Sequence, residues 1–338
     1  MTSATPTAAP LLELKGVSKC FARHSDWVDR AARVLEGVLA TETIHAVDGV
    51  DLMILEREVV GLVGESGCGK STLGRIAAGL LSPSAGMRLW RGAQLVETSQ
   101  GVARAQQLKM QMIFQDPHAS LNPRQRVVDI VGEAPVVHKM VKRRNQVEYV
   151  ALQLNRVGLD PALMRRFPHQ FSGGQRARIG IARALAVKPE FLVCDESVAA
   201  LDVSIRAQVL NLFMDLRSAL NLTYLFISHD LGVVRHVSDR VVVMYLGRIV
   251  ESGPTDEIFA APNHPYTQAL LKEIGSVEPK KRRYVPIRGE IPSPLSPPSG
   301  CHFHPRCVHA MPRCREAAPR LAEIAPGRWS ACYLNQAA

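Results

Sequence analysis

The loop from Gly64 to Ser71, with the sequence GESGCGKS, has the residue types and spacing that bind a polyphosphate. It fits the pattern G-x-x-x-x-G-K-[ST] and lies between a short apolar run, VVGLVG, and a helical pattern, KSTLGRIAAGLL. Glycines let successive backbone N–H groups turn toward phosphate oxygens, and the N-terminus of the helix adds positive potential. We expect Lys70 to reach the β and γ phosphates and the Ser71 hydroxyl to bind Mg²⁺. The predicted ATP-binding set in this segment is Gly64, Glu65, Ser66, Gly67, Cys68, Gly69, Lys70, Ser71 and Thr72.

A pair of carboxylates, Asp195 and Glu196, closes the apolar run FLVCD at 191–195. A run of this kind is typical of a buried parallel strand, and ligands of open α/β sheets bind beyond the carboxyl ends of such strands. Asp195 is expected to hold Mg²⁺ through water, and Glu196 to polarise the attacking water. The alternative is that the two acids only cap the next helix.

A second small-residue segment, Ser172-Gly173-Gly174-Gln175, precedes the helical pattern RARIGIARALAV. It predicts another helix N-terminus able to bind an anion, yet no second phosphate-binding lysine accompanies it. The simplest explanation is that this segment caps the γ-phosphate of ATP held by another chain. Taken alone, the same four residues would be an ordinary N-cap followed by a loose turn.

The surrounding pattern predicts an α/β core. The segments LLELKGVSKCF and AVDGVDLMIL predict short strands, and the stretch at 27–39 between them predicts a helical insertion. Residues 116–170 are helical in pattern and punctuated by proline, as in an inserted subdomain, and YLFIS at 224–228 predicts a further buried strand.

Composition limits the function classes without choosing among them. The 338 residues, 46% of them hydrophobic, predict one main domain and a tail. A formal net charge of +10 suits nucleic acid, an anionic ligand or an anionic membrane surface. No run approaches the roughly 18 apolar residues of a spanning helix, and the opening MTSATPTAAP lacks a basic signal region. These features predict a cytoplasmic location.

The motifs together resemble the ABC ATPases over about residues 11–275. The resemblance is carried by the phosphate-binding loop, the FSGGQ signature, the Asp-Glu pair and His229 in FISHD. It implies an α/β P-loop NTPase (RecA-like) core with an N-terminal antiparallel β subdomain and an inserted α-helical subdomain at about 116–180. A Pro-rich linker at 276–300 and a Cys-rich C-terminal metal-binding tail at 301–338 would follow.

The resemblance also implies roles for individual residues. Gln115, after the strand-like MIF, resembles the glutamine that senses the γ-phosphate and faces the transmembrane partner. His229 resembles the switch histidine that contacts the γ-phosphate and positions Glu196, so the catalytic set would be Glu196, His229 and Lys70. The Mg²⁺ ligands would be Ser71, Gln115 and Asp195. Asp202 resembles the aspartate that crosses the dimer interface, where it would join Ser172, Gly173, Gly174 and Gln175.

Two positions depart from the family pattern, and one role stays open. Where the family frequently has D-E-P and S-A-L-D, this chain has Asp195-Glu196-Ser197 and Ala199-Ala200-Leu201-Asp202. Neither change removes a catalytic group, so activity is expected. Phe21 is the candidate for stacking on adenine, with Trp27, His45 and a plain core role for Phe21 as alternatives.

Further segments resemble the ATPase subunits of peptide and nickel importers. These are IFQDPHASLNPR (113–124), DVSIRAQVLNL (202–212) and NHPYTQALL (263–271), followed by a tail containing GCHFHPRC. By resemblance the tail holds a structural 4Fe-4S cluster on Cys301, Cys307, Cys314 and Cys332. Spacing alone leaves Zn²⁺ open, since four thiolates suit either metal and His302, His304 and His309 lie among them.

The resemblance therefore implies an ATP-hydrolysing subunit that energises a membrane importer of di- or oligopeptides. Its partners would be a second, related ABC ATPase, two transmembrane permease subunits and, indirectly, an extracytoplasmic substrate-binding protein. It would lie peripherally on the cytoplasmic face of the inner membrane and bind no nucleic acid. Nickel or glutathione import is the alternative within the family, and a soluble ABC ATPase acting on ribosomes or DNA is the alternative outside it.

Overall fold

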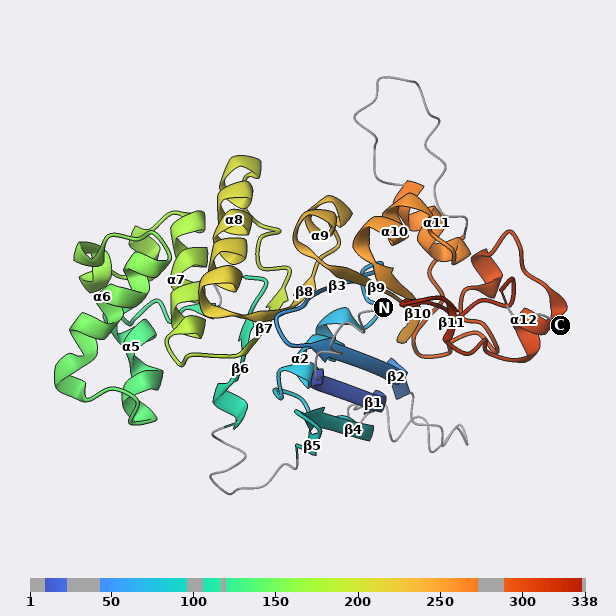
Figure 1. Cartoon of the computed structure of the whole chain (residues 1–338), viewed down its shortest axis with the longest axis horizontal. Helices are drawn as coiled ribbons and strands as arrows, with labels where there is room; N and C mark the ends of the chain where they lie inside the picture. Colours follow the sequence, from blue (N-terminus) through green and yellow to red (C-terminus); the bar gives the residue numbers. More distant parts are fainter. Residues whose placement is uncertain (1–9, 23–42, 96–105, 117–119, 273–288, 336–338) are drawn as a thin grey trace, which may run out of the picture.

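The computed structural model describes residues 10–22, 43–95, 106–116, 120–272 and 289–335, which form two sheets covered by helices (Figure 1). The predicted insertion at 27–39, with Trp27, lies outside these residues. The described helices are α2 (Lys70–Ala77), α5 (Val127–Val137), α6 (Gln146–Arg156), α7 (Gly173–Leu185), α8 (Val203–Leu220), α9 (Leu231–Val237), α10 (Thr255–Ala260), α11 (Pro265–Lys272) and α12 (Pro312–Glu316).

The larger sheet has eight strands in the order β11-β12-β10-β9-β3-β8-β7-β6. Its parallel part consists of β9 (Arg240–Tyr245), β3 (Val59–Val63), β8 (Thr223–Ile227), β7 (Phe191–Asp195) and β6 (Met110–Ile113). Every residue of β3, β7 and β8 is buried, which explains why these strands read as unbroken apolar runs in the sequence. Their carboxyl ends meet along one edge, where the predicted site residues follow.

The smaller sheet is antiparallel, with the order β2-β1-β4-β5. Its strands are β1 (Pro10–Ala22), β2 (Thr43–Leu55), β4 (Ala85–Trp90) and β5 (Ala93–Gln94). Leu12, Leu14 and Ile54 pack with Val60 and Leu62 of β3 in one buried cluster, to which α2 also contributes. The parallel strands therefore lie between this sheet with α2 on one face and helices that include α8 and α9 on the other (Figure 1).

Helices α5, α6 and α7 gather at one end of the molecule, and α12 lies at the other (Figure 1). A second apolar cluster joins the three helices to the sheet through residues such as Val131, Leu154 and Ile181. None of the described helices is long and apolar enough to span a membrane.

The C-terminal residues extend the larger sheet. Strand β12 (Arg328–Ser330) pairs with β10 (Arg248–Pro254), and β11 (Ala322–Ala325) pairs with β12. Phe303 packs in a third apolar cluster with Tyr245 of β9 and Tyr266 of α11. The described part of the tail is therefore continuous with the larger sheet and with its apolar packing.

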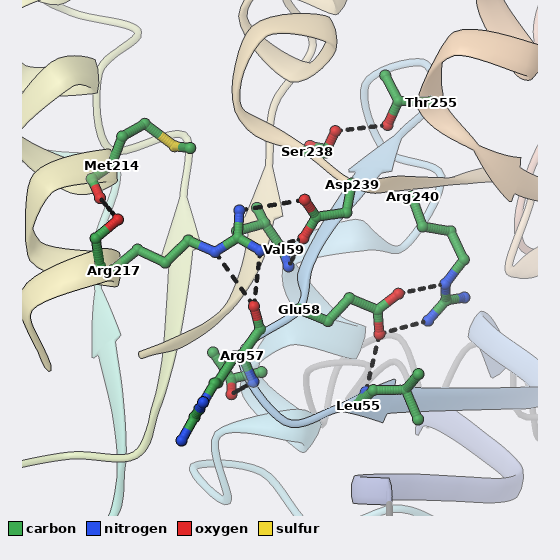
Figure 2. Close-up of polar contacts among 12 residues, drawn as sticks. Leu55, Arg57, Glu58, Val59, Met214, Arg217, Ser238, Asp239, Arg240 and Thr255 are labelled. Atoms are coloured by element: carbon green, nitrogen blue, oxygen red, sulfur yellow. Dashed lines mark hydrogen bonds and ion pairs between the residues drawn. The ribbon is translucent and has the colours of Figure 1, made fainter. Parts of the chain in front are cut away.

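A polar network joins the amino ends of the parallel strands, on the edge opposite the site residues (Figure 2). Arg217, near the end of α8, donates to both carboxylate oxygens of Asp239 and to the backbone carbonyl of Arg57. Asp239 also accepts from the Val59 N–H at 2.8 Å. Beside them, Arg240 donates to Glu58, whose carboxylate accepts the Leu55 N–H. The network ties α8 to the turn that connects the two sheets.

We expect Arg217→Ala to lower the free energy of unfolding by about 1–2 kcal/mol, because charge-assisted hydrogen bonds to Asp239 and to a backbone carbonyl are lost together. The measurement is urea unfolding of the purified chain. Ser218→Ala is the matched control on the same helix turn, since its hydroxyl only bonds back to the Met214 carbonyl. Equal unfolding midpoints for the two variants would contradict the role of the network.

Candidate functional site

The loop between β3 and α2 is shaped by glycines at positions that admit no side chain. Gly64 and Gly69 have φ of 154° and 103°. A Cβ on Gly64 would lie 2.2 Å from the Met244 carbonyl oxygen, and one on Gly69 would lie 2.0 Å from that of Ala46. The loop is therefore held between β9 and β2, and its backbone N–H groups can approach a phosphate chain closely.

Lys70 begins α2 and is 5% exposed. Its ammonium group donates to the carbonyl oxygens of Gly64 and Glu65, both at 2.8 Å, so it lies within the curve of the loop. From there the ammonium group is close to the loop N–H groups that would surround the phosphates.

The two groups predicted to bind Mg²⁺ from opposite sides of the site are in contact. The Ser71 hydroxyl donates to Asp195 Oδ1 at 2.9 Å, although 124 residues separate them in the sequence. Asp195 ends β7 and is buried; burial raises the pKa of its carboxyl group, while the Ser71 hydrogen bond and the charges of Arg75 and Lys70 lower it. A hydroxyl and a carboxylate together supply the oxygen ligands that Mg²⁺ prefers.

Glu196 is the point at which three separate segments meet. Its side chain accepts a hydrogen bond from Gln115 Nε2 at 2.6 Å, and its other oxygen lies 3.2 Å from His229 Nδ1. The Glu196 N–H donates to the Ile227 carbonyl, and its backbone has φ of 45°, in the left-handed region that non-glycine residues seldom occupy. The structure thus brings Gln115, Glu196 and His229 together beyond the ends of β6, β7 and β8. A carboxylate held between an amide and an imidazole can orient and polarise a water molecule.

The signature segment starts α7. Ser172 is its N-cap: its hydroxyl accepts the Gln175 N–H, and the Gln175 side chain accepts the Ser172 N–H. A Cβ on Gly174 would lie 2.4 Å from Ile205 of α8, so packing between the two helices requires glycine there. Ser172 and Gly173 are exposed and present a helix N-terminus to the surface. The ordinary N-cap geometry is therefore present, and the exposed face stays available to a second chain.

Asp202 is exposed at the start of α8, one turn before Arg206, a residue that the sequence analysis did not single out. Arg206 donates to the carbonyl oxygens of Ala199 and Leu201 and to Asp230, the residue after His229. It thereby ties the segment that precedes Asp202 to the turn that carries the histidine. In the sequence, the only indication of a role for Arg206 was its spacing: it lies four residues after Asp202, on the same face of the predicted helix.

Nothing in the structure explains why this chain has Ser197 where the family frequently has proline. Its side chain is buried and its hydroxyl has no hydrogen-bond partner among the described residues.

The adenine candidates Phe21 and His45 lie on neighbouring strands that border the loop. Cys20 of β1 pairs with His45 of β2, and Ala46, the residue after His45, is the one that touches Gly69. The Phe21 ring is 38% exposed, with the Lys19 ammonium 5.4 Å from its centroid. Phe21 is therefore not a plain core residue, while Trp27 lies outside the described residues.

The four tail cysteines are free thiols that influence one another. Burial raises the pKa of the Cys301 thiol to about 11, and the neighbouring charges of Cys314, Cys307 and Cys332 act in the same direction. The backbone N–H groups of Phe303, His309 and Leu334, each two residues after a cysteine, bond to the preceding sulfur. Nevertheless, the described ranges contain no group of three or more His, Cys, Asp or Glu side chains arranged to hold a metal ion, so the predicted metal-binding character of the tail is not shown.

Comparisons with known proteins agree with this geometry. Residues 47–199 match the family model described as ABC transporter, and residues 250–314 match that of the oligopeptide/dipeptide transporter C-terminal region. The chain is 48% identical over 331 residues to the oligopeptide transport ATP-binding protein AppF of Bacillus subtilis, covering 96% of this chain and 97% of AppF. It is 43% identical to the dipeptide transport ATP-binding protein DppF of Haemophilus influenzae, covering 91% of each.

The fold is also similar to solved structures. The dimeric ATP-binding cassette MJ0796, bound to ADP and Pi, matches with a TM-score of 0.61 and 24% identity, over 72% of this chain and 98% of that chain. At this identity the likeness concerns the fold alone.

We expect Glu196→Gln to lower the rate of MgATP hydrolysis by about 10²–10⁴-fold, because an amide cannot accept the proton of the attacking water. Affinity for the nucleotide should be retained, since Lys70 and Ser71 are unchanged. The measurement is phosphate release by the assembled ATPase together with fluorescent-nucleotide binding. Glu190→Gln, just before β7 at the opposite edge of the sheet, is the control and should hydrolyse ATP normally; equal rates in both variants would refute the assignment.

Proposed function

The chain belongs to the ABC transporter family of ATP-binding proteins and to its oligopeptide/dipeptide branch, and on that premise we propose that it is the ATP-hydrolysing subunit that energises import of di- and oligopeptides. The observation that carries the proposal is the convergence of Gln115, Glu196 and His229 beside the contact of Ser71 with Asp195. In this proposal the residues that would hold Mg²⁺ and those that would orient water are adjacent at one edge of the sheet.

The proposed roles follow from these contacts. Lys70 would neutralise the β and γ phosphates, and Ser71, Gln115 and Asp195 would hold Mg²⁺, Asp195 through water. Glu196 polarises the attacking water and His229 holds Glu196 in place and senses the γ-phosphate. Phe21 stacks on adenine from β1.

Hydrolysis in this proposal requires two nucleotide domains that face each other. The exposed N-terminus of α7, with Ser172 and Gly173, caps the γ-phosphate of ATP held on the loop of the other domain, and Asp202 crosses the same interface. The second domain is a related but different ATPase chain. Closure on ATP and reopening after product release would drive the transport cycle.

A groove beside Gln115 is the proposed docking surface for the transmembrane permease subunits. It has a volume of about 700 Å³ and is lined by residues from β6, α5 and α7. Leu80, Phe114 and Val137 line it and are 52%, 38% and 66% exposed. Exposed apolar side chains that line one groove are typical of a partner site. Phe114 directly precedes Gln115, whose side chain contacts Glu196. Movement of a permease segment docked against Phe114 would therefore be transmitted to Glu196 through the Gln115 side chain.

This arrangement implies a peripheral position on the cytoplasmic face of the inner membrane, with the extracytoplasmic substrate-binding protein acting only through the permease.

We propose residues 11–275 as the nucleotide-binding domain, 276–300 as the linker and 301–338 as the tail. Nickel or glutathione as the imported solute remains the alternative substrate. Action on ribosomes or DNA is disfavoured by the relatives' peptide-transport assignments.

We further propose that Cys301, Cys307, Cys314 and Cys332 hold a 4Fe-4S cluster, with Zn²⁺ as the alternative. Four free thiols, three of which accept a backbone N–H, are the kind of ligands that such a group takes. The group would supply a cross-link that stabilises a short, loop-rich segment.

The function is tested by uptake of a labelled dipeptide and a labelled longer peptide in cells that lack other peptide importers. Lys70→Ala should reduce uptake to background because phosphate binding is lost.

Val137→Asp should also reduce uptake, because a charge in the groove prevents docking, while leaving MgATP binding by the purified chain unchanged.

Val147→Asp is the matched control for the groove, since Val147 is 59% exposed on α6 and does not line it. This variant should transport peptides normally. Undiminished peptide uptake by Lys70→Ala would remove the peptide assignment and direct the same assay to nickel and glutathione. Equal uptake by the two aspartate variants would remove the docking assignment.

The cluster is tested on chain purified without oxygen. We expect about four iron and four sulfide per chain, with loss of both in Cys314→Ser. About one Zn²⁺ per chain would establish the alternative, and a chain free of both metals would exclude a metal site.

A further inference from the structure

A charged pair connects the C-terminal tail directly to the phosphate-binding loop. Arg306 donates through Nη1 and Nη2 to the two carboxylate oxygens of Glu65, at 2.7 Å and 2.9 Å. The residues are 241 positions apart, and their side chains are only 5% and 17% exposed. Such a two-point contact fixes the orientation of both groups, and loss of one partner would leave the other charge poorly solvated and unpaired.

Glu65 is the residue after Gly64, inside the loop that would surround the phosphates. Its N–H donates to the Tyr266 hydroxyl at 2.8 Å, and its carbonyl accepts the Lys70 ammonium at the same distance. Its carboxylate, N–H and carbonyl are therefore each bound to a different element. A shift of this residue would move the carbonyl group on which Lys70 rests.

Arg306 is itself held in an aromatic setting. It lies in the short turn His304–Arg306, with its guanidinium 5.9 Å from the centre of the Tyr245 ring. Phe303, in the same segment, packs edge-on against Tyr245 and at 5.4 Å from Tyr266. Tyr266 also receives the Glu65 N–H, so the tail and α11 support the loop as one packed unit.

The charge of Glu65 gives this contact a functional consequence. A carboxylate in a phosphate-binding loop repels the phosphates, and poor access to solvent makes that repulsion stronger. Arg306 neutralises the carboxylate and keeps it turned toward the tail. We propose that Arg306 is a positioning residue for the nucleotide site, which holds the Glu65 carboxylate away from the phosphates and thereby sets the affinity of the loop for MgATP. The inference rests on the proposed ATPase function and adds the tail to its nucleotide site.

The test measures binding of a fluorescent ATP analogue with Mg²⁺ to the purified full-length chain. Arg306→Ala should raise the dissociation constant about tenfold or more, because the carboxylate is left unpaired beside the phosphates. Adding Glu65→Gln to that variant should restore most of the affinity, because the repelling charge is removed. Arg306→Lys, which keeps the charge but not the two-point contact, should fall between native chain and Arg306→Ala.

Arg313→Ala is the matched control. Arg313 lies in the same tail, stacks on Tyr333 at 4.1 Å and, like Arg306, adjoins a cysteine. This variant should bind MgATP as the native chain does. The proposal is overturned by native affinity in Arg306→Ala, by equal weakening in the two alanine variants, or by failure of Glu65→Gln to rescue. Absence of MgATP binding by the native chain would instead refute the proposed function.

Discussion

The geometry of the whole site depends on a close approach of backbones around the phosphate-binding loop. Gly64 lies against the Met244 carbonyl of β9 and Gly69 against the Ala46 carbonyl of β2, so close that neither position has room for a Cβ. The Cys68 carbonyl accepts the Gly247 N–H, and the Gly247 carbonyl accepts the Asp48 N–H. These contacts use only main-chain atoms and join the two sheets at the loop. The phosphate position is thereby defined by both sheets, which is why the smaller sheet can also present the adenine candidates.

Much of the core was predictable because its strands are short, fully apolar and bounded by residues with an evident role. Runs such as 59–63 and 191–195 are buried on both faces, and burial of that kind leaves a plain signal in the sequence. Strand β12 gave no such signal in the sequence, because it has only three residues and pairs with β10 at only two register positions. Such short pairing depends on main-chain hydrogen bonds that any residue except proline can donate, so the continuity of the tail with the sheet could not be predicted from the sequence.

The residues of the candidate site likewise include some that could be predicted from the sequence and some that could not. Asp195 and Glu196 could be singled out because they follow a buried apolar strand in a chain whose phosphate-binding loop needs acidic partners, and Ser71 because its motif is specific. Arg206 and Arg306 were not predictable. Each binds a carboxylate from another segment, 24 and 241 residues away, and in the sequence an arginine on a polar stretch indicates only a solvated surface. Their roles arise from partners that the fold brings together.

The segment NHPYTQALL, which carried the resemblance to peptide importers, has a physical role at the loop. Glu251, fully buried in β10, accepts the N–H groups of Asn263 and His264. Burial raises the pKa of the Glu251 carboxyl group, and the two N–H donors counter that shift by favouring its ionised form. This contact fixes the start of α11, and the His264 imidazole then accepts the Tyr266 N–H. Tyr266 is thereby placed with its hydroxyl toward the N–H of Glu65. The segment 263–271 thus supplies a contact to the same loop residue that Arg306 binds. Two separate parts of the region that matches the oligopeptide/dipeptide transporter C-terminal family, α11 and the turn His304–Arg306, therefore meet at the phosphate-binding loop.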